Sequence, residues 1–135
     1  MRRFDLSSEA GRYQLHATAM LIGDDLLVAI WGGTRPHIGA VAVALPRPSL
    51  ADPQITSSTS SVFTLLGHKE DTVVKMVSER LSARLEKNVV VTAGIHWDHL
   101  PEEAIEEIVH HCGELADEIH ARIIREGGSK TENGE

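Results

Sequence analysis

The stretch DTVVKMVSERLSARLEKNVVVTAGI, residues 71–95, contains the change of pattern that decides the fold class. Apolar residues recur at helical spacing through its first half, which predicts a helix that begins near Asp71 and ends near Asn88. The β-branched run from Val89 to Ile95 then predicts a well-buried strand. A helix that leads directly into such a strand indicates one domain in which helices pack on a sheet.

The residues on either side of this stretch predict the remaining elements. Upstream, apolar runs separated by turn residues predict a hairpin over residues 13–31 and further strands over residues 38–45 and 62–67. Downstream, Pro101 opens a long helix with one apolar stripe, which we expect to end at the glycine pair that begins at Gly127. The predicted fold is therefore α+β, with a mainly antiparallel sheet covered by two helices.

Three segments are expected to lie outside these elements. The connector over residues 46–61 contains three of the five prolines and many of the serines, which indicates a loop or a functional flap. Residues 1–10 and 127–135 are polar and contain little to bury, so both termini are predicted to be loose. A single domain over residues 11–126 remains.

Charge is unevenly distributed along the chain, whose formal net charge is −7. Residues 98–135 contain eleven acidic and three basic residues, whereas residues 1–97 are close to neutral. An acidic helical surface disfavours nucleic acid, which requires a basic footprint. The nearly neutral part can still hold a phosphate, because that requires only one or two well-placed cations and some backbone N–H groups.

The sequence also limits the compartment and the catalytic class. The single cysteine, Cys112, excludes an intramolecular disulfide framework, and no apolar run approaches the roughly 18 to 20 residues of a membrane helix. We therefore expect a soluble, cytoplasmic protein that does not enter membranes. Nucleotide-binding, serine-hydrolase and zinc-protease motifs are missing, and Cys112 lies in the apolar stripe of the long helix, so no catalytic residue is predicted.

Three segments combine glycine, basic and histidine residues at the ends of predicted strands or before the first predicted helix. They are GGTRPHIG at residues 32–39, GHKEDT at residues 67–72 and TAGIHWDH at residues 92–99. If the segments converge, their N–H groups, cations and imidazoles form a pocket for a flat, anionic ligand. The alternative is three unrelated turns. The candidate binding residues in these segments are Gly32, Gly33, Thr34, Arg35, His37, Gly39, His68, Lys69, Gly94 and His96.

Arg80 and Arg84 add a fourth candidate element. They lie four residues apart in the first predicted helix, on the same flank of its apolar stripe. Their guanidinium groups are therefore expected to emerge together, which would allow them to clamp a phosphate. The alternative is a solvated helix face, on which they pair with Glu79 and Glu86.

Histidines in the loops allow a different kind of site. His37, His68, His96 and His99 each lie just outside a predicted strand, where loops carry function. A divalent metal ion held by His37, His68 and His96 would make the protein a small metal-dependent enzyme or an enzyme subunit. No spacing among these residues is a metal-binding signature, so the primary prediction contains no metal.

The segments GGTRPHIG, GHK, SERLSARL and TAGIH, in this order and at these spacings, resemble the small D subunit family associated with gallate and hydroxybenzoate decarboxylases. The resemblance covers residues 11–125 and is most specific at residues 32–39 and 92–96. It implies a homodimer with a fold similar to the proteasome assembly chaperones. It also implies a non-enzymatic function, which is to hold reduced prenylated flavin mononucleotide (FMN) and deliver it to an apo prenyl-flavin-dependent decarboxylase of aromatic acids.

The chemistry of the matched residues suggests individual roles toward this ligand. Residues 32–34 offer N–H and hydroxyl donors to the flavin phosphate or to a ring edge. The candidate cations for the phosphate are Arg80, as the first choice, and Arg35, Lys69 and Arg84. His37 and His96 are expected to face the reduced ring. Trp31 or Trp97, each of which adjoins a matched motif, can stack on that ring. A further alternative is a protein assembly chaperone without a small ligand, which would use the acidic long helix as its contact surface.

Overall fold

The computed structural model describes residues 2–65 and 70–132, which form one six-stranded sheet and two helices. The elements in chain order are β1 (Arg2–Ser7), β2 (Leu15–Ile22), β3 (Asp25–Gly33), β4 (Ala40–Pro48), β5 (Thr56–Thr64), α1 (Glu70–Leu85), β6 (Val89–His96) and α2 (Glu102–Glu132). The order across the sheet is β1-β2-β3-β6-β4-β5. Neighbouring strands are antiparallel except for β3 and β6, which run parallel. The predicted α+β fold with a mainly antiparallel sheet is confirmed.

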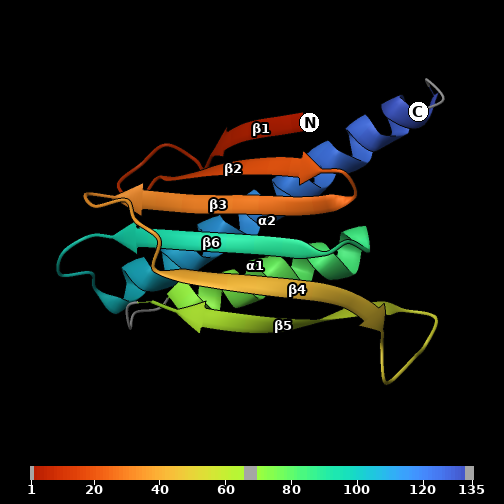
Figure 1. Ribbon diagram of the computed structural model, residues 1–135. Helices are drawn as coiled ribbons and strands as arrows, with labels where there is room; N and C mark the ends of the chain where they lie inside the picture. Colours follow the sequence, from red (N-terminus) through yellow and green to blue (C-terminus); the bar gives the residue numbers. More distant parts are fainter. Residues whose placement is uncertain (1, 66–69, 133–135) are drawn as a thin grey trace.

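Both helices pack on the same face of the sheet (Figure 1). α1 covers β4, β5 and β6, whereas α2 lies against α1 and against β1 and β2. The strands alternate accordingly: Leu26, Val28 and Ile30 of β3 are buried in the core, and the intervening Leu27 and Ala29 are only partly buried. The sheet therefore has one face in the core and one face without helical cover.

The uncovered face of the sheet is rich in apolar side chains. Cross-strand pairing places Leu27 beside Met20, Val43 beside Val90, and Val41 beside Phe63. Val43, Leu45 and Phe63 are exposed. We call this surface the open face and define it by Met20, Leu27, Trp31, Val41, Val43, Leu45, Phe63 and Val90.

The N-terminal segment belongs to the sheet, so the prediction that residues 1–10 are loose is wrong for Arg2–Ser7. β1 pairs with β2 along its whole length at one edge of the sheet. Phe4 and Leu6 alternate with polar residues and are buried, and Cζ of Arg122 lies 4.8 Å from the centre of the Phe4 ring. Burying side chains of this kind contributes about 1.5–3 kcal/mol each, which helps to hold a short edge strand in place.

The proline- and serine-rich connector is shorter than predicted, because strands occupy both of its ends. β4 continues to Pro48, and the strand predicted over residues 62–67 is found at Thr56–Thr64. Both prolines of β4 lie beyond the residues that pair with β6, where a missing N–H interrupts no pairing on that side. The polar side chains of β5 find partners on α1; the Ser60 hydroxyl donates to the Glu79 carboxylate at 2.6 Å.

The helices also differ from the prediction at their ends. α1 begins at Glu70, one residue before the predicted start, and α2 continues past Gly127 to Glu132, so the predicted end of that helix at the glycine pair is wrong. A glycine costs a helix only about 1 kcal/mol relative to alanine and does not by itself end it. Neither described helix has the length and apolar character needed to cross a membrane. Cys112 is fully buried in α2, and burial raises its pKa to about 12, as expected for a core thiol.

Candidate ligand-binding site

Three elements bring predicted site residues to one end of the sheet, which we call the loop pole. The parallel strands β3 and β6 both end there, and β4 begins there. The β3–β4 loop (residues 34–39) and the β6–α2 loop (residues 97–101) therefore emerge at the same end, on the left in Figure 1, where α1 also begins. The structure thus brings two of the three predicted segments together. In the third, GHKEDT, His68 and Lys69 lie outside the described residues.

Close backbone approaches join the two loops. Gly33 has a φ of +91°, and a Cβ on it would overlap the carbonyl group of His96. A Cβ on Gly94 would likewise overlap the carbonyl group of His37. The N–H and the hydroxyl of Thr34 both donate to the His96 carbonyl oxygen, at 2.8 and 3.3 Å. These residues therefore hold the loops in contact, and the two Thr34 donors predicted for a ligand already have a protein partner.

Gly32, another predicted ligand donor, and Gly39, a predicted binding residue, have structural partners as well. A Cβ on Gly32 would lie 2.7 Å from Cδ2 of Leu15, so this glycine allows close packing against β2. The N–H of Gly39 donates to the carbonyl oxygen of Ala93 at 2.9 Å. Both glycines thus contribute to the shape of the loop pole.

The His37 side chain contacts the buried carboxylate of Glu70 at the loop pole. Its Nδ1 donates to the carbonyl oxygen of Arg35 at 2.9 Å, and its Nε2 lies 3.2 Å from Oε2 of Glu70. The side chains of His37 and Glu70 are 26% and 5% exposed. Because a carbonyl oxygen can only accept, Nδ1 carries one hydrogen, and a second hydrogen must lie between Nε2 and Oε2. A Cβ on Gly39 would overlap the carboxylate, so the absence of a side chain there makes room for it.

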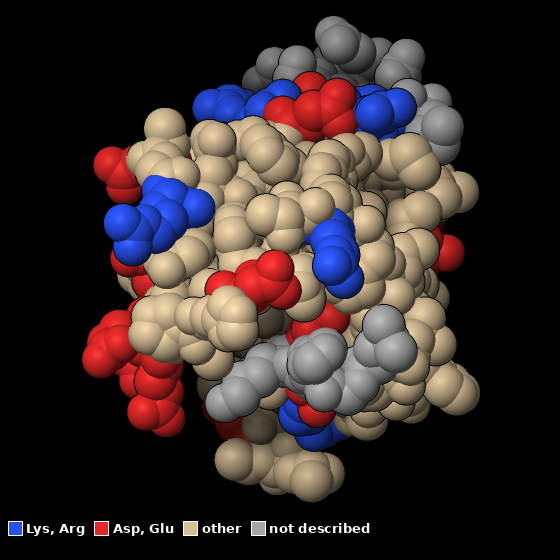
Figure 2. All heavy atoms as spheres, turned by 90° about the vertical axis from the view of Figure 1, so that its left-hand side faces the viewer, with Lys and Arg blue, Asp and Glu red and all other residues tan. Residues whose placement is uncertain are grey.

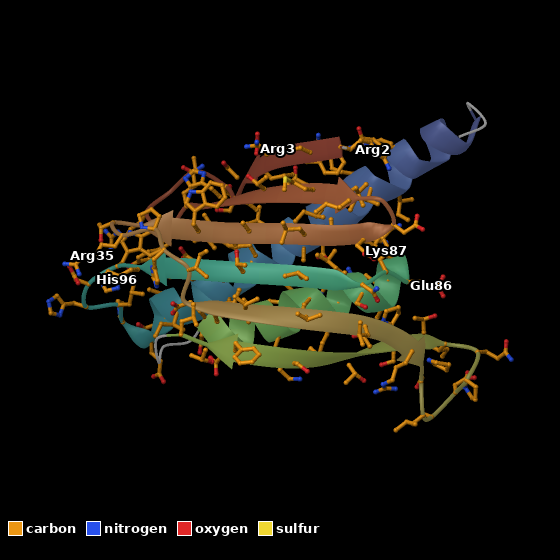
Figure 3. All side chains as sticks on the ribbon, in the orientation of Figure 1. Arg2, Arg3, Arg35, Glu86, Lys87 and His96 are labelled. Carbon is orange, nitrogen blue, oxygen red and sulfur yellow. The ribbon has the colours of Figure 1, made fainter. Side chains whose placement is uncertain are left out.

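His96 makes a second contact between an imidazole and a carboxylate, closer to solvent. Its Nε2 lies 3.0 Å from Oδ1 of Asp98. The hydrogen bond from His96 and the charge of His96, with a smaller effect from the charge of Arg35, hold the pKa of Asp98 below its ordinary value of 3.8. Arg35 and His96 project from the same end of the sheet (Figure 3). Arg35 is therefore a cation close to the His96–Asp98 pair.

A cavity of about 340 Å³ lies between the start of α1, the end of β6 and the first turns of α2. Trp97 forms part of its wall, and the Trp97 ring packs edge-on against Tyr13 with 5.3 Å between ring centres. The volume of the cavity is within the range of small-molecule sites. The apolar lining consists of Val73, Ile95, Trp97, Leu100, Ile105, Ile108 and Val109, and the polar lining of Glu70, His96, Asp98 and His99. Figure 2 looks onto this pole, where acidic side chains gather on one side and basic side chains are scattered.

Arg80 and Arg84 lie away from the loop pole. Arg80 follows Glu70 by ten residues, which is about 15 Å along α1. Arg84 donates to Oδ1 of Asp117 at 2.6 Å, and Arg80 donates to the carbonyl oxygen of Gly113 at 3.2 Å and to the same Asp117 oxygen at 3.4 Å. The two guanidinium groups emerge together, but they connect α1 to α2, and the structure does not bring them to the cavity.

Within residues 2–65 and 70–132, no group of three or more histidine, cysteine, aspartate or glutamate side chains is arranged to hold a metal ion. His37 and His96 each pair with a different carboxylate. His68, the third residue of the metal hypothesis, lies outside the described residues, so that hypothesis stays a prediction.

Glu70 lines the cavity but is not among the site residues that the sequence predicts. An acidic residue in the first turn of a helix is ordinary, because it complements the helix dipole. Asp71, the next residue, is exposed, and its carboxylate accepts from the Thr72 N–H at 2.8 Å. Only burial distinguishes Glu70 from Asp71, and burial depends on the His37 loop and on α2. The one available hint was the position of Glu70 directly after the GHK motif.

The architecture is similar to that of a solved chaperone structure. It aligns with a solved structure described as a novel chaperone complex for yeast 20S proteasome assembly, with a TM-score of 0.59 and 14% sequence identity, over 90% of this chain and 98% of that one. At this level of identity the likeness shows the fold. The predicted similarity to proteasome assembly chaperones is thereby confirmed.

Sequence comparison identifies the family. The family model of the prenylated flavin chaperone LpdD-like domain matches residues 9–124. The chain is also 28% identical to Protein LpdD of Lactiplantibacillus plantarum over 118 residues. This aligned region covers 87% of this chain and 80% of that protein. This chain therefore belongs to the prenylated flavin chaperone LpdD-like family, in agreement with the resemblance found in its motifs.

Proposed function

We propose that this protein binds reduced prenylated FMN and delivers it to an apo prenyl-flavin-dependent decarboxylase of aromatic acids, as an accessory subunit that catalyses no reaction itself. Membership of the LpdD-like family supports the ligand class. The observation that supports binding most directly is the cavity at the loop pole, because it combines apolar walls with a few polar groups.

The residues of this cavity suit a reduced, prenylated isoalloxazine ring. The apolar walls match the added prenyl ring, and Trp97 offers an aromatic surface to a flat ligand. His96 supplies an imidazole for hydrogen bonding at the rim. The bound flavin supplies its chemistry only after transfer to the decarboxylase, so the residues of this chain have to bind the ring, orient it and keep water away from it.

We assign the phosphate to Arg35 in preference to Arg80 and Arg84. A volume of about 340 Å³ suits the ring system, so we expect the ribityl phosphate to lie outside the cavity. Arg35 is close enough to Asp98 of the cavity lining for its charge to lower the pKa of that carboxyl, so this cation lies beside the cavity. The guanidinium groups of Arg80 and Arg84 are bonded to α2. Lys69 is a second candidate cation from the matched motifs.

We further propose that two copies of the chain associate through the open face. This face contains apolar side chains from five strands, and no described helix covers it. An apolar surface that spans several strands is characteristic of an interface. A second copy presents the same apolar surface, and a two-fold axis allows the two sheets to pack on each other.

The function is tested by mixing the purified protein with reduced prenylated FMN under anaerobic conditions, followed by gel filtration with absorbance detection. We expect the flavin to co-elute with the protein and to activate an apo decarboxylase when the two proteins are mixed. His96→Ala should retain less flavin while keeping the wild-type circular dichroism spectrum. Free flavin that elutes entirely apart from the wild-type protein would contradict the proposal.

A further inference from the structure

The carboxylate of Glu70 is the most deeply buried polar group in the cavity lining. Its side chain is 5% exposed, whereas Asp98 and His99 of the same lining are exposed. The walls around it are apolar, and the lining given by the described residues contains no lysine or arginine. Burying a carboxylate is costly unless it is paired and hydrogen-bonded, so its position requires an explanation.

Stabilisation of α1 does not explain this burial. A first-turn carboxylate complements the helix dipole from an exposed position, as Asp71 does. Glu70 instead faces the cavity, and the β3–β4 loop packs against its carboxylate. His37 bonds to Oε2, and the bare backbone of Gly39 leaves space for the carboxylate.

The contact with His37 leaves the carboxylate with capacity to accept more hydrogen bonds. An ionised carboxylate has about four lone-pair sites, and among the described residues only the His37 side chain is hydrogen-bonded to it. His37 is itself anchored through Nδ1 to the carbonyl oxygen of Arg35, so it fixes the direction of the carboxylate. The cavity therefore presents a fixed acceptor to a ligand that carries an N–H group.

The isoalloxazine ring carries such a group. Its pyrimidine edge has one imide N–H between two carbonyls, and prenylation takes place on other rings and leaves this edge unchanged. An N–H group that enters an apolar cavity needs an acceptor there. We propose that Glu70 accepts the hydrogen bond of the imide N–H of reduced prenylated FMN and that His37 is the positioning residue for the carboxylate. This assignment rests on the function proposed above.

The test compares two ligands on the intact protein: reduced prenylated FMN and its analogue methylated at the imide nitrogen. Dissociation constants are measured anaerobically by fluorescence titration. The wild-type protein is expected to bind the methylated ligand about 10- to 100-fold more weakly, because a charge-assisted hydrogen bond to a buried group is lost. In Glu70→Ala, the two ligands should differ by less than about threefold, since the partner of the N–H is missing.

Two further variants complete the design. Glu102→Gln changes an exposed acidic residue at the start of α2 and should keep the full discrimination between the ligands. His37→Ala should reduce the discrimination while leaving the affinity for the methylated ligand unchanged. A role of His37 in folding alone would weaken the binding of both ligands equally and would contradict its role as a positioning residue.

The possible outcomes separate this inference from the proposed function. Equal affinity of the wild-type protein for the two ligands overturns the assignment, and that comparison requires no variant to fold. Discrimination that persists undiminished in a folded Glu70→Ala protein overturns it as well. If the wild-type protein binds neither ligand, the proposed function itself is wrong, and the inference is rejected with it.

Discussion

The carbonyl oxygen of His37 occupies the space in which a Cβ of Gly94 would lie, so the β3–β4 loop and strand β6 are in direct backbone contact. This contact places the His37 loop against the strand that leads to His96. It also explains why the motif TAGIH contains a glycine at position 94, while the approach of Gly33 to the His96 carbonyl group explains the glycine at position 33. The packing of the two loops at the loop pole therefore requires a residue without a side chain at position 94.

Gly94→Ala is expected to lower the free energy of unfolding by about 1–3 kcal/mol, because the new methyl group overlaps backbone that cannot move aside without separating the loops. Urea denaturation measures the loss. Gly11→Ala is the matched control, since a Cβ there would meet nothing within 4 Å, and its effect should stay within about 0.5 kcal/mol. Equal stability of the two variants would contradict the close approach.

His37 and Glu70 are expected to be energetically coupled. His37→Ala leaves the buried carboxylate without its imidazole partner and should cost about 1–3 kcal/mol of unfolding free energy. A double-mutant cycle with Glu70→Gln should give a coupling above about 0.5 kcal/mol. His110→Ala, which removes a largely exposed side chain on α2, serves as the control for the loss of an imidazole. Additive effects of the two substitutions would show that the pair does not interact.

The titration of Asp98 should depend on His96. The folded-state pKa of Asp98 lies below 3.8, so its contribution to stability is fully present above that value and is lost as the pH falls through the folded-state pKa. His96→Ala removes the largest cause of the shift and should move the pKa of Asp98 back toward 3.8. A carboxyl-detected NMR titration of both proteins measures the change. An unaltered pKa would mean that the His96–Asp98 contact is absent in solution.

Arg35 and Arg80 should differ in their effect on phosphate recognition. Arg35→Ala is expected to weaken the binding of reduced prenylated FMN by roughly 5- to 10-fold and to leave the binding of the dephosphorylated ligand unchanged. Arg80→Ala removes contacts to Gly113 and Asp117 and should affect stability without changing the preference for the phosphorylated ligand. The opposite pattern in a comparison of the two ligands would assign the phosphate to Arg80.

Val43→Lys should prevent the proposed homodimer from forming, because it places a charge on the open face, where Val43 is 43% exposed. Sedimentation velocity at several concentrations gives the association state. Leu50→Lys is the matched control, since Leu50 is 92% exposed in the β4–β5 loop, away from the open face. Dimers of unchanged stability in Val43→Lys would place the interface elsewhere.

Local patterns were sufficient for the elements that bury a regular apolar repeat. Val73, Val77 and Leu81 are fully or almost fully buried on α1, as their spacing predicted, and Val89–His96 forms a central strand. The edge strands were missed or displaced in the prediction. β1 buries only two large apolar side chains, and β5 is mostly serine and threonine, so both depend on backbone pairing with a neighbour that is distant in the sequence.

The sequence by itself determined the fold class, the family and the loops in which glycine and histidine gather, because local spacing and motif order are properties of the chain alone. Only the tertiary structure showed that Arg80 belongs to the contact between α1 and α2 and that Glu70 lines the cavity. Both outcomes depend on which element packs against a helix face. The packing of the whole core decides which element lies there, so residue type and helical spacing alone do not predict it.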